Sequence, residues 1–403
     1  MASTLSAVLR ARGVREAMQW FTREKQWINE IHQQVCRVPA PTFLEQQRAE
    51  WVAGQLRAFG CHTQIDRAGN VLAALQPFGA GPYLAITAHL DTVLAPRLKE
   101  DIQADAAGVL HGPGVSDNGA GLAALLALAR ALTLGPPPDW GEAELLLVAN
   151  VGEEGEGNLS GMRYLCGKSP LAGAIGAFLI LDGAATDHIT TEALGSRRFE
   201  LTFTGSGGHS WSDYGIGNPV HALARAVARL ADIRLSGAPR ASLNVGVMEG
   251  GTGVNVIAAQ ARAKIDIRSE SNDKMDDLVD LLQQVAEQAL ESENQRATGA
   301  KVSMKLREIG SRPAGKLPED AALLRNLRAV DAHLGIRAST EAASTDANIP
   351  LSLGRPALSI GAGGQGGGAH TWQEWFNPEG RDLGLKRILL TAALQMHEGT
   401  AAQ

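Results

Sequence analysis

Five positions along the chain carry side chains that could bind metal ions, and each follows an apolar or glycine-rich segment. They are His89, Asp117, Glu154, Asp182 and His370. Nitrogen and oxygen donors without a thiolate suit a hydrolytic site of two zinc ions, which lie about 3.5–4 Å apart and share one bridging carboxylate. Each signal is weak alone, and the ordered set is what predicts a metal-dependent hydrolase.

His89 and Asp91 follow the apolar run 83–88, and the segment 83–89 predicts a buried strand. Residues two apart in a strand share a face, so a carboxylate at Asp91 could hold the His89 imidazole in one tautomer. The ends of parallel strands are also where open α/β sheets place ligands. The alternative is a surface turn with two polar residues.

Two adjacent carboxylates, Glu153 and Glu154, follow the predicted strand 143–150. Adjacent side chains point in different directions, so one could bind metal while the other acts as a general base towards a metal-activated water. The alternative is a solvated loop. Asp182 ends a further apolar strand, 177–181, and could equally be a polar strand end.

Two glycine-rich segments contain the remaining candidate ligands. Asp117 lies within 112–121, just before a predicted helix at 120–132, where it could instead serve as a helix cap. His370 follows 361–368, which lacks the Gly-Lys-Ser/Thr ending of a phosphate-binding loop. Glycines allow the backbone to approach closely, so both segments are expected to pack around one site.

The elements that position these residues form two patterns. Strands alternate with helices over about the first 190 residues, which predicts a mostly parallel sheet covered on both faces. From about 194 to 307 the order is strand, helix, strand, strand, helix, strand, which is typical of a ferredoxin-like α+β domain. The first pattern then resumes. We therefore predict a catalytic domain formed by 1–193 and 308–403, with 194–307 inserted into it.

The ordered set resembles a family of zinc-dependent exopeptidases and deacylases that includes peptidase T, carboxypeptidase G, acetylornithine deacetylase, succinyl-diaminopimelate desuccinylase and the aminoacylases. The resemblance extends over roughly residues 15–395. It implies that His89 and Asp182 bind one metal ion and that Glu154 and His370 bind the other. Asp117 would bridge the two ions.

The same resemblance implies the roles of two residues that bind no metal. Asp91 would orient His89, and Glu153 would be the general base acting on a metal-bridging water, whose hydroxide attacks the amide carbonyl. Many family members carry Asp or Lys directly after the bridging Asp, whereas this chain has Asn118.

The inserted domain resembles the lid and dimerisation domain of that family. The resemblance implies that His209 stabilises the oxyanion, often across a dimer, and that Asn255 contacts the substrate. It also implies that Arg268 holds a substrate carboxylate, which suits bidentate guanidinium geometry. The alternative for His209 is a histidine in a turn, and that for Asn255 is a position in a hairpin loop. The alternative for Arg268 is an arginine in a surface ion pair. The segment 344–347 also resembles a family segment near the site, for which we expect a supporting role.

The composition excludes several other classes. A net charge of −6 over 403 residues argues against a nucleic-acid binder. The longest apolar stretch, 121–134, contains Arg130 and is too short to span a membrane. The N-terminal residues lack a signal-peptide pattern, and three cysteines without paired spacing fit a reducing cytoplasm.

The sequence therefore predicts a cytoplasmic, homodimeric dizinc hydrolase of small peptides or N-acyl amino acids, in which cobalt or manganese could replace zinc. A carboxypeptidase or a deacylase of the same family is the alternative to a di- or tripeptidase. A one-domain zinc aminopeptidase shares the order of ligands but lacks such a lid. A non-catalytic metal-binding member would have lost a ligand or the base.

Overall fold

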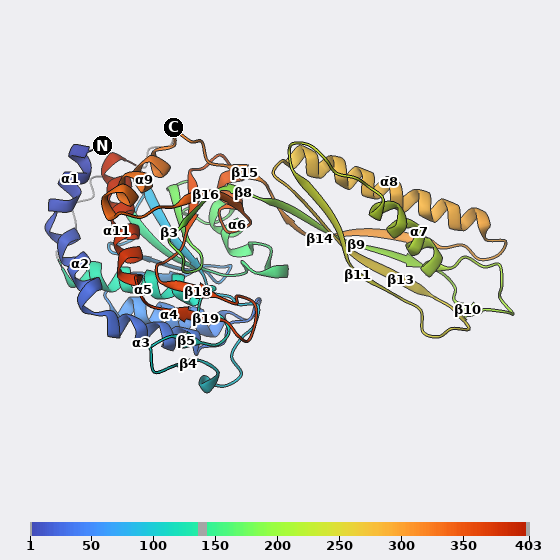
Figure 1. Ribbon diagram of the computed structural model, residues 1–403, viewed down its shortest axis with the longest axis horizontal. Helices are drawn as coiled ribbons and strands as arrows, with labels where there is room; N and C mark the ends of the chain where they lie inside the picture. The colour runs from blue at the N-terminus through green and yellow to red at the C-terminus, as the bar shows by residue number, and fades with distance from the viewer. Residues whose placement is uncertain (1, 136–142, 400–403) are drawn as a thin grey trace. The chain divides into compact units, whose positions relative to one another are not determined.

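Two units make up the chain in the computed structural model, which describes residues 2–135 and 143–399 (Figure 1). The first unit combines the residues up to Ala193 with those from Lys316 onward, and the second is Leu194–Gly315. The boundary expected after residue 307 lies inside strand β14 (Ser303–Arg312). Since β14 is a continuous strand of the second unit's sheet, the unit ends only after it.

A nine-stranded mixed sheet forms the centre of the first unit within the described residues. Its order is β1 (His62–Ile65), β2 (Val71–Ala74), β6 (Glu144–Asn150), β3 (Tyr83–His89), β7 (Ile175–Leu181), β17 (Ala357–Ile360), β8 (His188–Ala193) and β15 (Gly315–Lys316), with β16 (Ser339–Ala343) paired to β8. The central strands β6, β3, β7 and β17 are parallel to one another. The predicted mostly parallel sheet is confirmed at this core.

Burial and register explain why polar residues gather at one edge of this sheet. Every side chain of β3 is buried although successive side chains point to opposite faces, so both faces are covered. His89 pairs with Asn150 of β6, and Thr87 pairs with Ile180 of β7. The carboxyl ends of three neighbouring strands therefore lie side by side.

Helices from both ends of the chain cover the sheet. They are α1 (Ala2–Arg10), α2 (Arg12–Arg23), α3 (Lys25–Cys36), α4 (Gln46–Ala58), α5 (Gly119–Leu134), α6 (Ser160–Gly167), α9 (Ala322–Leu334), α10 (Asn348–Ser352) and α11 (Arg381–Glu398). The predicted Ala- and Leu-rich helix is α5, which is buried along most of its length. Helix α11 packs against α2, α5 and α9, so the last part of the chain completes the first unit (Figure 1). Among the helices described, none has the length and apolar character needed to cross a bilayer.

The second unit has its own sheet and core. Strands β9 (Gly195–Thr204), β11 (Ala241–Gly250), β13 (Gln260–Ser269) and β14 form an antiparallel sheet in the order β11-β13-β9-β14. Phe199, Leu201 and Phe203 of β9 alternate inward and pack with residues of α7 (Pro219–Ala231) and α8 (Asn272–Arg296). This arrangement confirms the predicted ferredoxin-like order. Two short strands, β10 (Gly208–His209) and β12 (Val256–Ile257), pair beside it.

A buried ion pair joins α9 to α11 and provides a test of the packing. Arg387 donates to both carboxylate oxygens of Asp331, at 2.6 and 2.7 Å, and both side chains are nearly inaccessible. Asp331→Asn would leave a buried guanidinium without its counter-ion, so we expect a loss of about 3–5 kcal/mol in the free energy of unfolding. Urea unfolding measures this loss. Asp277→Asn, at an exposed position of α8, is the control, and a change of less than about 1 kcal/mol in Asp331→Asn would contradict the prediction.

Candidate metal centre

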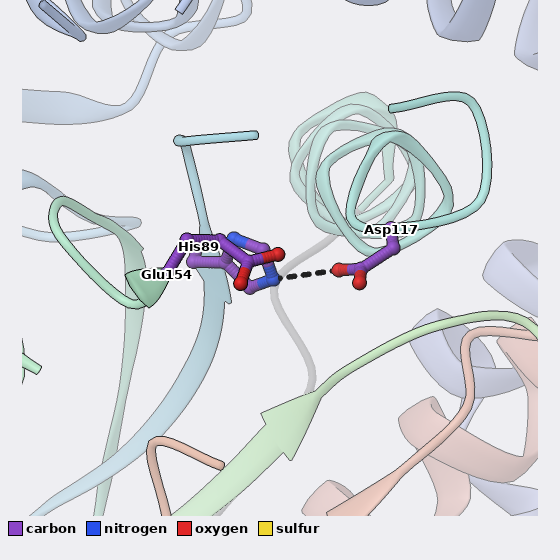
Figure 2. Close-up of side chains that lie close together, drawn as sticks. All are labelled: His89, Asp117 and Glu154. Atoms are coloured by element: carbon purple, nitrogen blue, oxygen red, sulfur yellow. Dashed lines mark hydrogen bonds and ion pairs between the residues drawn. The ribbon is translucent and has the colours of Figure 1, made fainter. Parts of the chain in front are cut away.

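The candidate ligands come together at the carboxyl edge of the central sheet. His89 is the last residue of β3, Asp182 directly follows β7, and Glu154 follows β6. Figure 2 shows His89, Asp117 and Glu154 pointing towards one another, and one potential ligand atom from each lies within 4.8 Å of the others. His370 joins them from the loop after β18 (Gln365–Gly367).

The carboxylate of Asp117 lies between two histidines. Its Oδ1 is 3.0 Å from Nε2 of His89, and its Oδ2 is 3.1 Å from Nε2 of His370. The same His370 nitrogen is 2.8 Å from Oε1 of Glu154, and Oδ1 of Asp182 is 3.9 Å from Nε2 of His89. A carboxylate with one histidine and one further acid on each side has the arrangement needed to bridge two metal ions.

Asp91 fixes the orientation of His89 through its main chain. Nδ1 of His89 donates to the backbone carbonyl of Asp91 at 2.9 Å, whereas the Asp91 carboxylate is 3.6 Å away. The sequence suggested that the carboxylate itself would hold the ring. The carbonyl does so because the carboxylate is directed instead at the N–H groups of Glu153 and Glu154. Nε2 is thereby directed at Asp117.

The carboxylate of Asp91 instead holds the segment that carries the two glutamates. It accepts the backbone N–H groups of Glu153 and Glu154 at 3.0 and 2.9 Å, and the hydroxyl of Thr42 at 3.0 Å. Burial raises the pKa of Asp91, but the nearby His89 ring and the hydrogen bonds from these N–H groups outweigh it and lower the pKa overall. Asp91 therefore positions both the histidine and the glutamate pair.

Burial of the acids, together with their mutual repulsion, indicates that the site suits a cation. Burial, and then the negative charge of Asp117, raise the pKa of Asp182 to about 7. Burial and the same charge raise the pKa of Glu154. A bound divalent ion would be the largest local charge and would reverse both shifts. Imidazole and carboxylate donors are also the ligands that zinc accepts, so the residues fit a dinuclear zinc site.

The raised pKa of His370 predicts how the metal-free protein responds to pH. A hydrogen bond to Asp117 and the nearby Glu154 carboxylate, opposed by desolvation, raise this pKa from 6.5 to about 9. Folding therefore favours the protonated ring, and the stabilisation is present below about pH 6.5 and is lost as the pH rises through about 9.

We expect the unfolding temperature of chelator-treated protein to fall over this interval. Thermal unfolding followed by circular dichroism at several pH values measures the fall. His370→Gln is the comparison, and we expect it to give a shallower decline over the same pH range. Equal slopes for the two proteins would contradict the assignment.

Close backbone packing surrounds Asp117, as the glycine-rich segments predicted. The alternative role of Asp117 as a helix cap is wrong, because Asn118 caps α5 by accepting the N–H of Gly121 at 3.1 Å. A side chain at Gly119 would collide with Cys36 Sγ, and one at Gly366 would collide with the Ser116 hydroxyl. The two glycine-rich segments therefore meet at the site, where these two positions leave no room for a larger residue.

The sequence did not reveal several buried contacts around the ligands. Asn150, which pairs with His89, donates to Oδ2 of Asp346 at 2.7 Å. Asp346 lies in the segment expected to have a supporting role, and its charge contributes to the raised pKa of Asp182. Glu374 was also missed, although its carboxylate accepts backbone N–H groups near Asp117. Nothing in the local sequence indicates these partners, which lie up to 260 residues away.

Within the second unit, two of the three predicted lid residues lie together. His209 of β10 pairs with Val256 of β12, and the N–H of Ser210 donates to the carbonyl of Asn255 at 3.0 Å. Nδ1 of His209 accepts the N–H groups of Trp211 and Ser212 at 3.2 and 3.4 Å. The proton of a neutral His209 must then be on Nε2, so the exposed side of the ring is a hydrogen-bond donor.

Arg268 lies apart from this pair. β12, which pairs with His209, is followed directly by β13, which begins at Gln260. Arg268 is eight residues further along β13, which corresponds to about 26 Å along a strand. Its Nε donates to Oδ2 of Asp266 at 2.7 Å, and Asp266 also faces Arg198. Within its own unit, Arg268 therefore forms an ion pair with Asp266. An ion pair was the alternative to the substrate-binding role of Arg268.

Two family models match parts of the chain. A family model described as a peptidase dimerisation domain, of the M20 peptidases, matches residues 191–294. A second model, described as peptidase family M28, matches residues 70–212. The first match begins at the junction between the units and extends as far as α8.

Two curated relatives are hydrolases of amide bonds. The chain is 27% identical over 307 residues to the cytosol non-specific dipeptidase of Escherichia coli, a match covering 65% of this chain and 57% of that protein. It is 28% identical over 317 residues to the succinyl-diaminopimelate desuccinylase of Ruegeria pomeroyi, covering 72% of this chain and 78% of that protein. The match to the dipeptidase thus spans little more than half of that protein.

A solved structure shares the fold over nearly the whole chain. It is that of the Bacillus subtilis YXEP protein, described as a dinuclear metal binding peptidase from the M20 family, with a TM-score of 0.64 and 16% identity. The alignment covers 92% of this chain and 97% of that one. At this identity the likeness is one of fold.

Proposed function

We propose that the chain is a member of the M20 peptidase family and a two-metal hydrolase of the amide bond in small peptides or N-acyl amino acids. The observation that carries this proposal is the Asp117 carboxylate, whose two oxygens face His89 and His370 at 3.0 and 3.1 Å. A carboxylate that lies between two histidines can bridge two metal ions, one beside each histidine.

We assign the metal ligands by the same geometry. His89 and Asp182 would hold one ion, Glu154 and His370 the other, and Asp117 would bridge them. Zinc suits these donors, and cobalt or manganese could substitute. Such ions polarise a carbonyl and acidify a bound water.

Glu153 is proposed as the general base. It is 5% exposed and belongs to neither ligand set, yet its backbone is fixed by Asp91 next to Glu154. A carboxylate there can take a proton from the attacking water and return it to the leaving amine. Its charge also acts on His89, which supports its proximity to the metal ligands.

The second unit would supply contacts to the substrate. The Nε2–H of His209 is a fixed donor of the kind that stabilises an oxyanion, and Asn255 lies beside it. Arg268 is proposed to bind the free carboxylate of the substrate, for which it would have to exchange its bond to Asp266. These three roles come from the family resemblance.

Two alternatives are less well supported. The M28 match at residues 70–212 fits a one-domain aminopeptidase, but the separate unit Leu194–Gly315 and the dimerisation-domain match favour the two-unit family. A non-catalytic protein would have lost a ligand or the base, and this chain retains all five ligands and Glu153. The substrate that the protein cleaves will distinguish a di- or tripeptidase from a carboxypeptidase or a deacylase.

Homodimerisation through the second unit is part of the proposal. The dimerisation-domain match supports it, and we expect sedimentation to give twice the 42.4 kDa of one chain. A mass of one chain over a wide concentration range would contradict it.

We propose a cytoplasmic location, and no nucleic acid or membrane as a partner.

The experiment that tests the activity is a screen of the zinc-loaded protein against dipeptides, tripeptides and N-acyl amino acids. We expect hydrolysis of at least one class. Each substrate is paired with its C-terminal amide, and loss of hydrolysis on amidation would support recognition of a free carboxylate. Failure to cleave any class with two ions bound would overturn the proposed activity.

A further inference from the structure

Glu374 is a buried acid that touches the segment around Asp117 and none of the proposed ligand side chains. Its side chain is 2% exposed. Oε2 accepts the N–H of Gly114 at 2.8 Å, and Oε1 accepts those of Ser116 and Asp117 at 2.7 and 2.8 Å. Its backbone carbonyl accepts a fourth N–H, from Gly112, at 2.9 Å. One residue thus holds most of the N–H groups of the segment 112–117, here called the aspartate segment.

Two carbonyl groups of the aspartate segment contact side chains of α3. Nε2 of His32 is 2.7 Å from the carbonyl of Val115, and Sγ of Cys36 is 3.6 Å from that of Gly114. Both α3 side chains are fully buried. The aspartate segment is therefore hydrogen-bonded both to side chains of α3 and to the side chain of Glu374.

Glu374 also lies close to His370 along the chain. The turn between them is closed by hydrogen bonds from Thr371 N to Gly368 O at 3.1 Å and from Glu374 N to Thr371 O at 3.4 Å. The Glu374 side chain therefore links the aspartate segment to the turn that follows His370. Across this link, Asp117 Oδ2 and His370 Nε2 are 3.1 Å apart.

We propose that Glu374 is a positioning residue that sets the place of the bridging carboxylate relative to His370, and thereby the affinity of the ion held by Glu154 and His370. This inference rests on the proposed two-metal function. Three converging N–H donors require an acceptor with two oxygens, and a carboxylate also adds the strength of charge-assisted hydrogen bonds. Outer residues that orient metal ligands typically change metal affinity 10–100-fold when replaced.

Glu374→Gln separates this role from simple packing, because the amide keeps the size of the side chain. It has one acceptor oxygen, so its NH₂ group must face the N–H of Gly114 or those of Ser116 and Asp117. Gln373→Ala is the matched control, since Gln373 is the preceding residue and is exposed. The proteins are freed of metal and titrated with zinc against a chromophoric chelator, and circular dichroism checks their folding.

We expect one of the two zinc sites of Glu374→Gln to weaken about 10–100-fold, while Gln373→Ala binds like the wild type. Glu374→Asp, which keeps the charge on a shorter side chain, is expected to weaken the same site and provides a second test if the amide variant does not fold. Wild-type affinity at both sites in either folded variant would overturn the positioning role. A wild type that binds no zinc would overturn the metal centre together with this role. A wild type that binds two zinc ions but cleaves no substrate would overturn the proposed activity alone.

Discussion

Glu153→Gln is expected to lower kcat by about 10²–10⁴-fold or more while the protein keeps both metal ions. The amide has the size of the carboxylate but cannot take a proton from water at neutral pH. Glu153 is not among the proposed ligands, and its backbone bond to Asp91 does not depend on its side chain. The loss should therefore appear in turnover, with metal binding and folding unchanged.

The measurement combines steady-state kinetics with metal analysis of the same preparation. Glu156→Gln is the matched control, because Glu156 is an exposed glutamate three residues later in the same segment. It should retain activity close to that of the wild type. Turnover of Glu153→Gln within tenfold of the wild type would show that another group accepts the proton.

Removal of metal is the second change with a large expected effect. A chelator should reduce hydrolysis to the background rate, because Asp117 then accepts hydrogen bonds from His89 and His370 and nothing acidifies the water. Zinc, cobalt or manganese should restore activity. Restoration should require two ions per chain, since the five proposed ligands would form two sets with one shared carboxylate.

Titration of activity against added metal, with metal content measured at each step, tests this second prediction. The chelator must be removed before the metal is added back. Full activity with one ion per chain would contradict the shared role of Asp117. Full activity in protein shown to be free of metal would overturn the metal centre.

The parts of the fold that the sequence predicted are those with a strong local pattern. Strand β3 was expected at 83–89 and is found at Tyr83–His89, because an apolar run of that length fits a doubly covered strand. Strand β1 was missed because His62–Ile65 is mostly exposed and has no apolar alternation. The position of β17 between β7 and β8 depends on pairing between segments far apart in the chain, which local periodicity does not contain.

The candidate site was predictable as a set of residue types at strand ends, but its supports were not. Asp91 was expected to act on His89, two residues away, yet its carboxylate also binds backbone groups more than 60 residues along the chain. Glu374 acts through N–H groups at 114–117, and backbone donors have no signature in a sequence. Asp117 and Asn118 are adjacent, and only the structure shows that the second one caps the helix.

The insertion of the second unit has a consequence for the order of folding during synthesis. Ser196 and Arg312 pair across β9 and β14, so the two ends of the inserted segment meet and it can fold once residue 315 has left the ribosome. The first unit cannot fold completely until β17 and α11 have been synthesised, because these elements complete its sheet and core. His370 emerges between them. A nascent chain would therefore carry a folded second unit before it has all five of the proposed metal ligands.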